Sequence, residues 1–547
     1  MSRKLKLSIL IIVLMFSTNL LFSAEYVLYN VNYIDVKNLV VLKDQTIVVK
    51  DDEITSIRPI KKFRKKKGMI LIDMTGKYVI PGLIDTHVHH ATSPEDWDNE
   101  KVTRMRLRNL LKGGVTSVRD MGGDNRVLTY LKRRADNDII QSPDIYFSVI
   151  IGGEEFFSDP RTVASAKGEI PGQVDWMRAV DETTDLDEVM LRAKGTGATG
   201  IKIYAKVPAA LISKLASAAK KHGLKAWSHA YVGDARPIDA VLGGVETISH
   251  APDISSEVVD KFYQLRRKKE MISNEQKLAS FKPENFDKLF TEMKTQGTIL
   301  DPTLTVFDAR SKSTEINVLI KEWGYFYTRL AHKNAIKIST GTDGTSDSAG
   351  VDFPLVQKEM QLLVEHAGLT PLEAIQAATI HGAEVIGIEQ ETGSIEEGKK
   401  ANLVILSKDP SHDILSAMNI SHVIKNGAFI YRGDNPELPF ISARISNGML
   451  WMSGQIGNHP GTMTLVSDGV EEQMSQSMKN IGYILQENNL DFDDIVKCTL
   501  MLENIDDWKS ASDIYKKFFN KLPTRSAFAT SGLALKAKLE IECIAEL

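Results

Sequence analysis

Cysteine is scarce in this sequence, and an excess of positive charge is lacking; both absences exclude classes of protein. Cys498 and Cys543 are the only cysteines among 547 residues, too few for a disulfide framework or a cysteine-rich zinc site. The formal net charge is −4, so no basic face for nucleic acid is expected. Hydrophobic residues make up 43% and charged residues 25%, which excludes a disordered chain. The length predicts about three or four domain-sized units.

Long hydrophobic runs are also scarce, and the most prominent one begins near the N-terminus. Three cations precede an apolar run from 7 to 16, and small residues follow it. This order is typical of a secretory signal peptide over residues 1–24 and predicts an exported, periplasmic or secreted protein. The alternative is an uncleaved anchor, because Phe22 is unfavourable at the third position before a cut after Ala24. No other run is long enough to cross a bilayer, so we expect no stable membrane span after cleavage.

The rest of the chain divides by its hydrophobic periodicity. Residues 79–384 alternate strand-like and helix-like runs, which predicts an α/β fold, a (β/α)8 TIM barrel with insertions. Residues 25–78 and 385–433 are rich in short strands and are predicted to form one small, split, β-sandwich-like domain. A turn-rich linker at 434–439 precedes an α+β unit at 440–547. The strand-like runs of the barrel are 79–84, 116–119, 144–149, 200–203, 225–228, 246–248, 298–300 and 336–339.

Potential metal ligands stand at the ends of several of these strands, where barrel active sites are built. His87 and His89 end the first strand and share one face, because side chains two apart on a strand point the same way. Lys202 lies between two isoleucines that we expect to face the helices, so its amine points inward. A buried ammonium is costly unless a carboxylate pairs with it or carbamylation removes its charge.

Three further side chains complete this candidate set. His229, His250 and Asp343 follow the fifth, sixth and eighth strands. Each histidine taken singly is more often a core residue than a ligand. The set of nitrogen and oxygen donors drawn from five strands nevertheless suits zinc or a similar divalent ion.

The barrel and its flanking segments resemble the amidohydrolase superfamily, in particular its imidazolonepropionase-like and prolidase-like members. The resemblance is carried by VIPGLIDTHVH at 79–89, GGVTSVRD at 113–120, GIKIY at 200–204 and TGSI at 392–395. It implies that His87, His89 and Asp343 bind one divalent ion and that His229 and His250 bind a second. It further implies two Zn²⁺ ions bridged by carbamylated Lys202.

The same resemblance implies a metal-dependent hydrolase of carbon–nitrogen bonds, acting on a dipeptide or an N-acyl amino acid. A hydroxide that bridges two metal ions would attack the carbonyl, and Asp343 would pass its proton to the leaving nitrogen. Tyr231 is a candidate donor to the carbonyl oxygen, with a packed aromatic ring as the alternative. The alternative function is hydrolysis of a cyclic amide, as in the imidazolonepropionase-like relatives.

Residues 440–547 resemble the RidA (YjgF-like) family of enamine/imine deaminases, which has an α+β, chorismate-mutase-like fold. The matching segments are SGQI at 453–456, PTRS at 523–526 and LEIECIA at 539–545. The resemblance implies that Arg525 holds a substrate carboxylate, that Glu540 positions water, and that sites form between the subunits of a homotrimer. Two alternatives stay open: imine hydrolysis as the main activity, or a non-catalytic trimerisation or binding module.

This unit differs from the RidA pattern at one position, and it contains both cysteines of the chain. Phe440 stands where RidA proteins commonly have a tyrosine. Cys498 and Cys543 each share a strand face with apolar residues and read as core cysteines, and a disulfide between them is left open.

Overall fold

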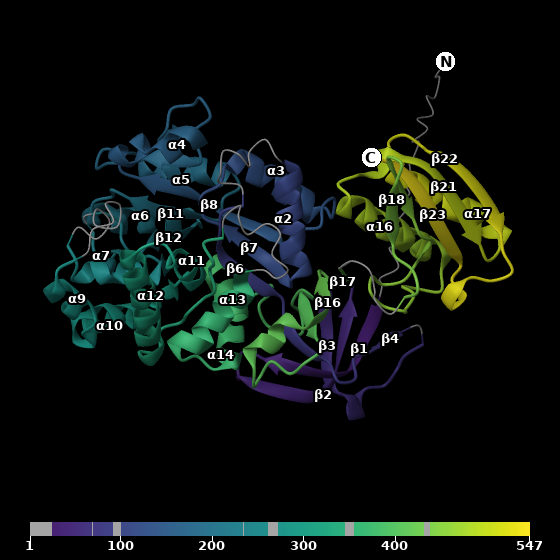
Figure 1. The fold of residues 1–547 in the computed structure, drawn as a ribbon, viewed down its shortest axis with the longest axis horizontal. Helices are drawn as coiled ribbons and strands as arrows, with labels where there is room; N and C mark the ends of the chain where they lie inside the picture. The colour runs from purple at the N-terminus through teal and green to yellow at the C-terminus, as the bar shows by residue number, and fades with distance from the viewer. Residues whose placement is uncertain are drawn as a thin grey trace, which may run out of the picture.

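The computed structural model describes residues 25–67, 69–90, 100–233, 235–260, 272–344, 355–430 and 438–547. The predicted signal peptide at 1–24 and residues 434–437 of the predicted linker lie outside these ranges. Over the described ranges, no helix combines the length and hydropathy needed to cross a membrane. The described residues form three sheets, and Figure 1 shows them as an N-terminal sheet of purple and green strands, a blue-to-green barrel and a yellow C-terminal unit.

The N-terminal sheet draws strands from both sides of the barrel. Its path runs β17-β16-β15-β5-β1-β2-β3, and β4 pairs with β1. Strand β5 pairs with β1 in parallel and with β15 antiparallel, so chain segments more than 300 residues apart meet in one sheet (Figure 1). The strands are β1 (Glu25–Asp35), β2 (Val40–Lys50), β3 (Glu53–Pro59), β4 (Ile70–Asp73), β5 (Tyr78–Pro81), β15 (Leu403–Leu406), β16 (Ile420–Lys425) and β17 (Ala428–Phe429).

The apolar run 79–84, predicted as the first barrel strand, is divided between two sheets. Strand β5 belongs to the N-terminal sheet, whereas β6 (Leu83–Val88) pairs with β7 of the barrel. Gly82 lies at the break, and its N–H donates to Asn402 O at 2.8 Å. A Cβ at this position would lie 2.1 Å from Thr116 Oγ1, so the chain can pass from sheet to sheet only with glycine here.

Parallel strands form the barrel, which confirms the predicted fold class. Their order is β6-β7-β8-β11-β12-β13-β14, and the short strands β9 and β10 extend from β8. The strands after β6 are β7 (Val115–Asp120), β8 (Asp144–Gly152), β9 (Gln173–Val174), β10 (Met177–Ala179), β11 (Gly200–Ala205), β12 (Lys225–His229), β13 (Thr247–Ser249) and β14 (Ile299–Asp301).

The eighth strand predicted at 336–339 is present only as two isolated parallel bridges. Ile338 bridges to Leu300 of β14, and Gly344 bridges to Val88 of β6, which closes the barrel. Between the bridges, the Thr342 N–H bonds to the carboxylate of Asp85 at 3.2 Å instead of to a neighbouring strand. Backbone hydrogen bonds are kept on either side, from Thr86 N–H to Thr340 O at 2.9 Å and from His89 N–H to Gly344 O at 2.7 Å, so the ladder is interrupted around Thr342.

Helices cover the outside of the barrel with one apolar face each. In α12 (Glu315–Lys333), Ile316, Leu319, Trp323 and Tyr327 are buried at helical spacing and join the main core. The others are α2 (Glu100–Lys112), α3 (Asn125–Asp136), α4 (Pro160–Ser165), α5 (Leu186–Gly195), α6 (Ala209–Lys221), α7 (Pro237–Leu242), α9 (Asn274–Ser280), α10 (Asp287–Gln296), α11 (Leu304–Arg310), α13 (Leu355–Leu362), α14 (Pro371–Gln376) and α15 (Gly382–Ile386).

The C-terminal unit is a sheet with one long helix, α16, and one short helix, α17, packed against it. The strand order is β18-β19-β23-β21-β22, and β20 pairs with β23. Met474, Met478, Ile481 and Leu485 form the buried stripe of α16 and pack on this sheet. The elements are β18 (Ala443–Ser446), β19 (Met449–Met452), β20 (Gln455–Ile456), α16 (Val470–Glu487), β21 (Ile495–Leu502), α17 (Trp508–Tyr515), β22 (Thr524–Ala529) and β23 (Leu539–Glu546).

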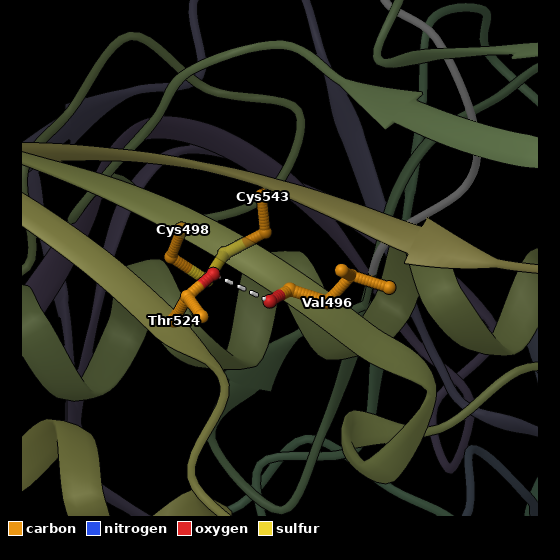
Figure 2. The surroundings of a disulfide bond; sticks show 4 residues. All are labelled: Val496, Cys498, Thr524 and Cys543. Atoms are coloured by element: carbon orange, nitrogen blue, oxygen red, sulfur yellow. Dashed lines mark hydrogen bonds between the residues drawn. A yellow bond between two sulfur atoms is a disulfide. The ribbon is translucent and has the colours of Figure 1, made fainter.

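The two cysteines, whose pairing the sequence left open, form a disulfide. Cys498 on β21 and Cys543 on β23 lie directly opposite each other, with Cα atoms 4.1 Å apart (Figure 2). Beside it, Thr524 Oγ1 donates to Val496 O at 2.9 Å, which ties β22 to β21. The disulfide thus links the two central strands of the C-terminal sheet.

Among the described residues, the C-terminal unit contacts the rest of the chain in two regions, at the end of α16 and around His459. At the end of α16, Glu487 pairs with Arg108 at 3.3 Å and with Lys112 at 2.6 Å, both on α2. Elsewhere the buried ring of His459 packs between Tyr26 and Phe429 of the N-terminal sheet, with ring centres 5.4 and 5.1 Å away.

Candidate metal centre

Three side chains at the mouth of the barrel come close enough to share one metal ion. His87 lies in β6, His89 follows it, and Asp343 lies in the segment that closes the barrel. Asp343 Oδ1 is 3.6 Å from His87 Nε2 and 3.2 Å from His89 Nε2. One ligand atom from each residue lies within 4.8 Å of the others. Two imidazoles and a carboxylate form a donor set that suits zinc or a similar divalent ion.

His229 and His250 form a second group next to the first. Their Nε2 atoms are 3.1 Å apart, and the ring centre of His250 is 4.9 Å from that of His87. His250 Nδ1 lies 2.8 Å from Thr303 Oγ1, which fixes the ring. The backbones of His250, Thr303 and Asp343 are left-handed, with φ of 73°, 52° and 49°. Such strained conformations cluster at functional sites.

Lys202 on β11 points into the barrel between these two groups. Ile201 and Ile203 belong to the core on the helix side, whereas Lys202 is 1% exposed and its Nζ lies 3.5 Å from His87 Nε2. The Tyr204 ring centre is 4.9 Å from Nζ. Among the described residues, no carboxylate forms an ion pair with this amine. Burial lowers the pKa of Lys202 to about 8.

The charge states of these groups suit metal binding. Burial is the main cause that lowers the pKa of His87, His229 and His250 well below 6.5, so these rings are neutral and keep a lone pair. Burial alone would raise the pKa of Asp343, but the hydrogen bond from His89 and the surrounding histidines hold it well below its ordinary value. An ionised carboxylate among neutral imidazoles is the state in which such residues bind a cation.

Asp301, the fully buried carboxylate beneath this centre, was not among the residues predicted from the sequence. Asp301 ends β14, and its Oδ2 lies 3.0 Å from His87 Nδ1, 3.2 Å from Arg119 Nη2 and 2.9 Å from Ser249 Oγ. Because His87 Nδ1 donates to this carboxylate, Nε2 is the nitrogen that faces the centre. The signal was present, since Asp301 directly follows the predicted strand 298–300.

Glu359 on α13 is a second buried carboxylate that supports the centre indirectly. It accepts from the backbone N–H groups of Leu304 and Thr305 at 2.8 and 2.7 Å, at the start of α11. That helix begins next to Thr303, the partner of His250. Burial raises the pKa of Glu359 to about 8. Glu359 therefore anchors the turn that orients His250.

Tyr231, the candidate proton donor, lies two residues beyond His229 and is partly buried. The six predicted ligands converge at one end of the barrel. They come from β6, β11, β12, the end of β13 and the closing segment. Neutral imidazoles, an ionised carboxylate and an amine without an acidic partner fit a pair of divalent ions.

In the C-terminal unit, the structure does not bring Arg525 and Glu540 together within one chain. Arg525 pairs in register with Cys498, and Glu540 pairs with Met501, three residues further along β21. Successive side chains on a strand alternate between faces, so Arg525 and Glu540 lie on opposite faces of the sheet.

These two side chains have different surroundings. Arg525 Nη2 donates to Ser512 Oγ at 2.9 Å, while the buried Nη1 has no hydrogen-bond partner among the described residues. The carboxylate of Glu540 lies over Gly454, where a Cβ would come within 1.9 Å of Oε1. Burial, followed by the charge of Glu542, raises the pKa of Glu540. Phe440 is exposed.

Comparison with known families agrees with this division of the chain. The family described as "Amidohydrolase family" matches residues 78–430, and the family described as "Endoribonuclease L-PSP", which contains the RidA proteins, matches residues 433–547. The chain therefore belongs to the amidohydrolase family and carries a RidA-family domain at its C-terminal end. Both predicted resemblances are confirmed.

Individual relatives match one part of the chain at a time. "Putative regulator AldR" from Lactococcus lactis subsp. lactis (strain IL1403) is 44% identical over 110 residues, 20% of this chain and 87% of AldR. The "2-iminobutanoate/2-iminopropanoate deaminase" of Homo sapiens is 37% identical over 108 residues, 20% of this chain and 79% of the human protein. The structure of a Xaa-Pro dipeptidase with bound methionine aligns with a TM-score of 0.57 and 23% identity, covering 74% of this chain and 99% of the other. That last likeness concerns the fold alone.

Proposed function

We propose that the barrel is a binuclear, metal-dependent hydrolase that cleaves the carbon–nitrogen bond of a dipeptide or an N-acyl amino acid. The observation that carries this proposal is the convergence of His87, His89, His229, His250, Lys202 and Asp343 at one end of the barrel. Membership of the amidohydrolase family supports hydrolysis of a carbon–nitrogen bond.

The residues divide into ligands and a proton carrier. His87, His89 and Asp343 would hold one ion, and His229 and His250 a second; Zn²⁺ suits both donor sets. When bound, the ions supply positive charge that polarises a substrate carbonyl and lowers the pKa of water. Asp343 accepts the proton of the attacking water and delivers it to the leaving nitrogen. Tyr231 is the candidate donor to the carbonyl oxygen.

Lys202 is proposed to be carbamylated and to lie between the two ions. Its amine is buried and has no ion pair with a described carboxylate, so the alternative of a lysine balanced by an acid lacks support. Addition of carbon dioxide to the neutral amine, with release of one proton, would give a carbamate anion with two oxygen donors, so no ammonium would be buried.

The substrate class is proposed from family membership and from the dipeptidase-like fold. The experiment is a hydrolysis assay of the zinc-loaded chain on Xaa-Pro dipeptides, N-acyl amino acids and cyclic amides. We expect His87→Ala and Lys202→Met to lower kcat/KM by about a thousandfold, a loss of about 4 kcal/mol of transition-state stabilisation.

Matched controls separate chemistry from folding in this assay. His222→Ala and Lys206→Met replace the same residue types outside the centre, and activity should be unchanged. Hydrolysis of cyclic amides alone would favour the imidazolonepropionase-like alternative. Full activity in Lys202→Met or in metal-free protein would refute the binuclear mechanism.

Export to the periplasm or beyond the cell is proposed from the N-terminal pattern at 1–24. The Cys498–Cys543 disulfide supports it, because disulfides persist in oxidising compartments and are rare in the cytosol.

A second activity, hydrolysis of enamines or imines, is proposed for the C-terminal unit. Arg525 and Glu540 lie on opposite faces of one sheet, so a site using both needs a second copy of the chain. This geometry supports a homo-oligomer, with a trimer implied by the RidA family.

Mixing two inactive variants tests the composite site. We expect Arg525→Ala and Glu540→Ala each to abolish imine hydrolysis, whereas refolded mixtures recover about a quarter of the sites, because one intact residue comes from each copy. No recovery, with Arg525→Ala alone inactive, would place the site within one chain. An oligomer that is inert with both residues intact would leave only a trimerisation or binding role.

A further inference from the structure

A basic stripe runs along α2 and meets the end of α16. Lys101, Arg104, Arg108 and Lys112 follow one another at helical spacing and so share one face of α2. The C-terminal half of this stripe is only partly neutralised, since Arg108 and Lys112 share one acidic partner, Glu487. Arg108 also donates to the carbonyl oxygen of Gln486. The single carboxylate of Glu487 is shared by two cations, so one positive charge remains at this end of the stripe.

The other half of the stripe faces a cavity between the barrel and the C-terminal unit. The cavity has a volume of about 340 Å³. Its lining residues are Glu100, Lys101, Arg104, Arg108, Ile140, Gln141, Gln486 and Asn489. Arg104 has one acidic partner among the described residues, Glu100, at 3.8 Å. Three cations and one carboxylate leave this cavity with an excess of positive charge.

Gln141 supplies an independent sign of a missing ligand. The residue is 7% exposed and lines the cavity, yet neither Oε1 nor Nε2 has a hydrogen-bond partner among the described residues. A buried amide without partners is costly, and such groups call for an explanation in a folded protein. The charge of Arg104, after burial, also contributes to lowering the pKa of Arg108, so the two cations repel each other.

We propose that this cavity binds a small oxyanion, a carboxylate or a phosphate, held by Arg104, Arg108 and the Gln141 amide. The guanidinium groups match the planar oxygens of such anions, and the amide Nε2 supplies a further donor. The volume leaves room for an organic body attached to the anion. Gln486 and Asn489 belong to the C-terminal unit, so the ligand contacts both units and stabilises their docking.

The test is isothermal titration of the full chain with succinate and, separately, with inorganic phosphate, at low salt. Saturable binding is expected for at least one of them, and the stronger one identifies the oxyanion. Arg104→Gln should weaken it at least tenfold, whereas Arg133→Gln on α3, a matched loss of charge outside the cavity, should not. The bound anion should also slow hydrogen exchange at residues 484–489.

A second variant tests the role of the Gln141 amide without removing a charge. Gln141→Leu keeps the size of the side chain but removes the unpartnered amide, so it should fold at least as stably as the wild type and bind the anion at least tenfold more weakly. If the anion bound at the metal centre instead of in this cavity, Arg104→Gln and Gln141→Leu would bind it as tightly as the wild type does. Equal affinity in the wild type, Arg104→Gln and Gln141→Leu, or no saturable binding of either anion, would overturn the proposal.

Discussion

Single residues at strand ends determine the chemistry of the barrel. The histidines and the inward lysine could be predicted from the sequence because position on a strand fixes the direction of a side chain. Asp301 also stands at the end of a strand, but it was not predicted. Its carboxylate supports a metal ligand and does not itself belong to the set of ligands. It acts through His87, whose Nδ1 it holds at 3.0 Å. A supporting carboxylate is recognisable only once its partner's position in space is known.

Replacing Asp301 tests this positioning role. We expect Asp301→Asn to weaken metal binding by about 10- to 100-fold, because the amide no longer fixes the tautomer of His87. It should also destabilise the fold by about 3–5 kcal/mol, since Arg119 is left buried without its anion. Competition with a chromogenic chelator measures the affinity, and urea denaturation measures the stability.

Asp136→Asn, on the exposed end of α3, is the matched control and should change neither quantity. Unchanged metal affinity in Asp301→Asn, despite a loss of stability, would reduce Asp301 to a structural role.

At the scale of elements, periodicity predicted most strands and helices within a few residues. The run 79–84 failed because hydrophobicity cannot show that Gly82 divides it between two sheets. The strand predicted at 336–339 is reduced to isolated bridges because the ladder is interrupted at Thr342, whose N–H bonds to Asp85 instead of to a neighbouring strand. Both failures occur where local sequence is overridden by pairing partners that are distant along the chain.

Contact between two elements also predicts a pH dependence. His459 packs on β1 and β17 at 6% exposure, and burial lowers its pKa from 6.5 to about 4. A depressed folded-state pKa means that this contact is fully stable above pH 6.5 and loses stability as the pH falls towards 4. At pH 5 the loss should be about 2 kcal/mol relative to pH 7.

Urea denaturation at pH 7 and pH 5 measures this loss. His459→Phe keeps an aromatic ring against Tyr26 and Phe429 and should reduce the pH dependence by that amount. His412→Phe, at an exposed site, should leave it intact. An identical acid response in His459→Phe and the wild type would show that His459 titrates as a solvent-exposed residue.

The whole molecule combines an amidohydrolase barrel with a RidA-family domain. Each unit could be predicted from motifs, because the residues that carry the motifs also build the strands. The docking of the two units could not be predicted, because it depends on contacts between residues that are distant along the chain, such as Glu487 with Arg108 and His459 with Tyr26.

The central claim is that residues from five parts of the barrel hold a pair of cations. The most direct measurement is the metal content of the dialysed, zinc-loaded chain by elemental analysis, alongside His229→Ala and Lys202→Met. We expect about two ions per chain in the wild type and fewer in both variants, because each variant removes a ligand of the second ion. A wild-type chain that retains no ion, or variants that retain two, would contradict the account.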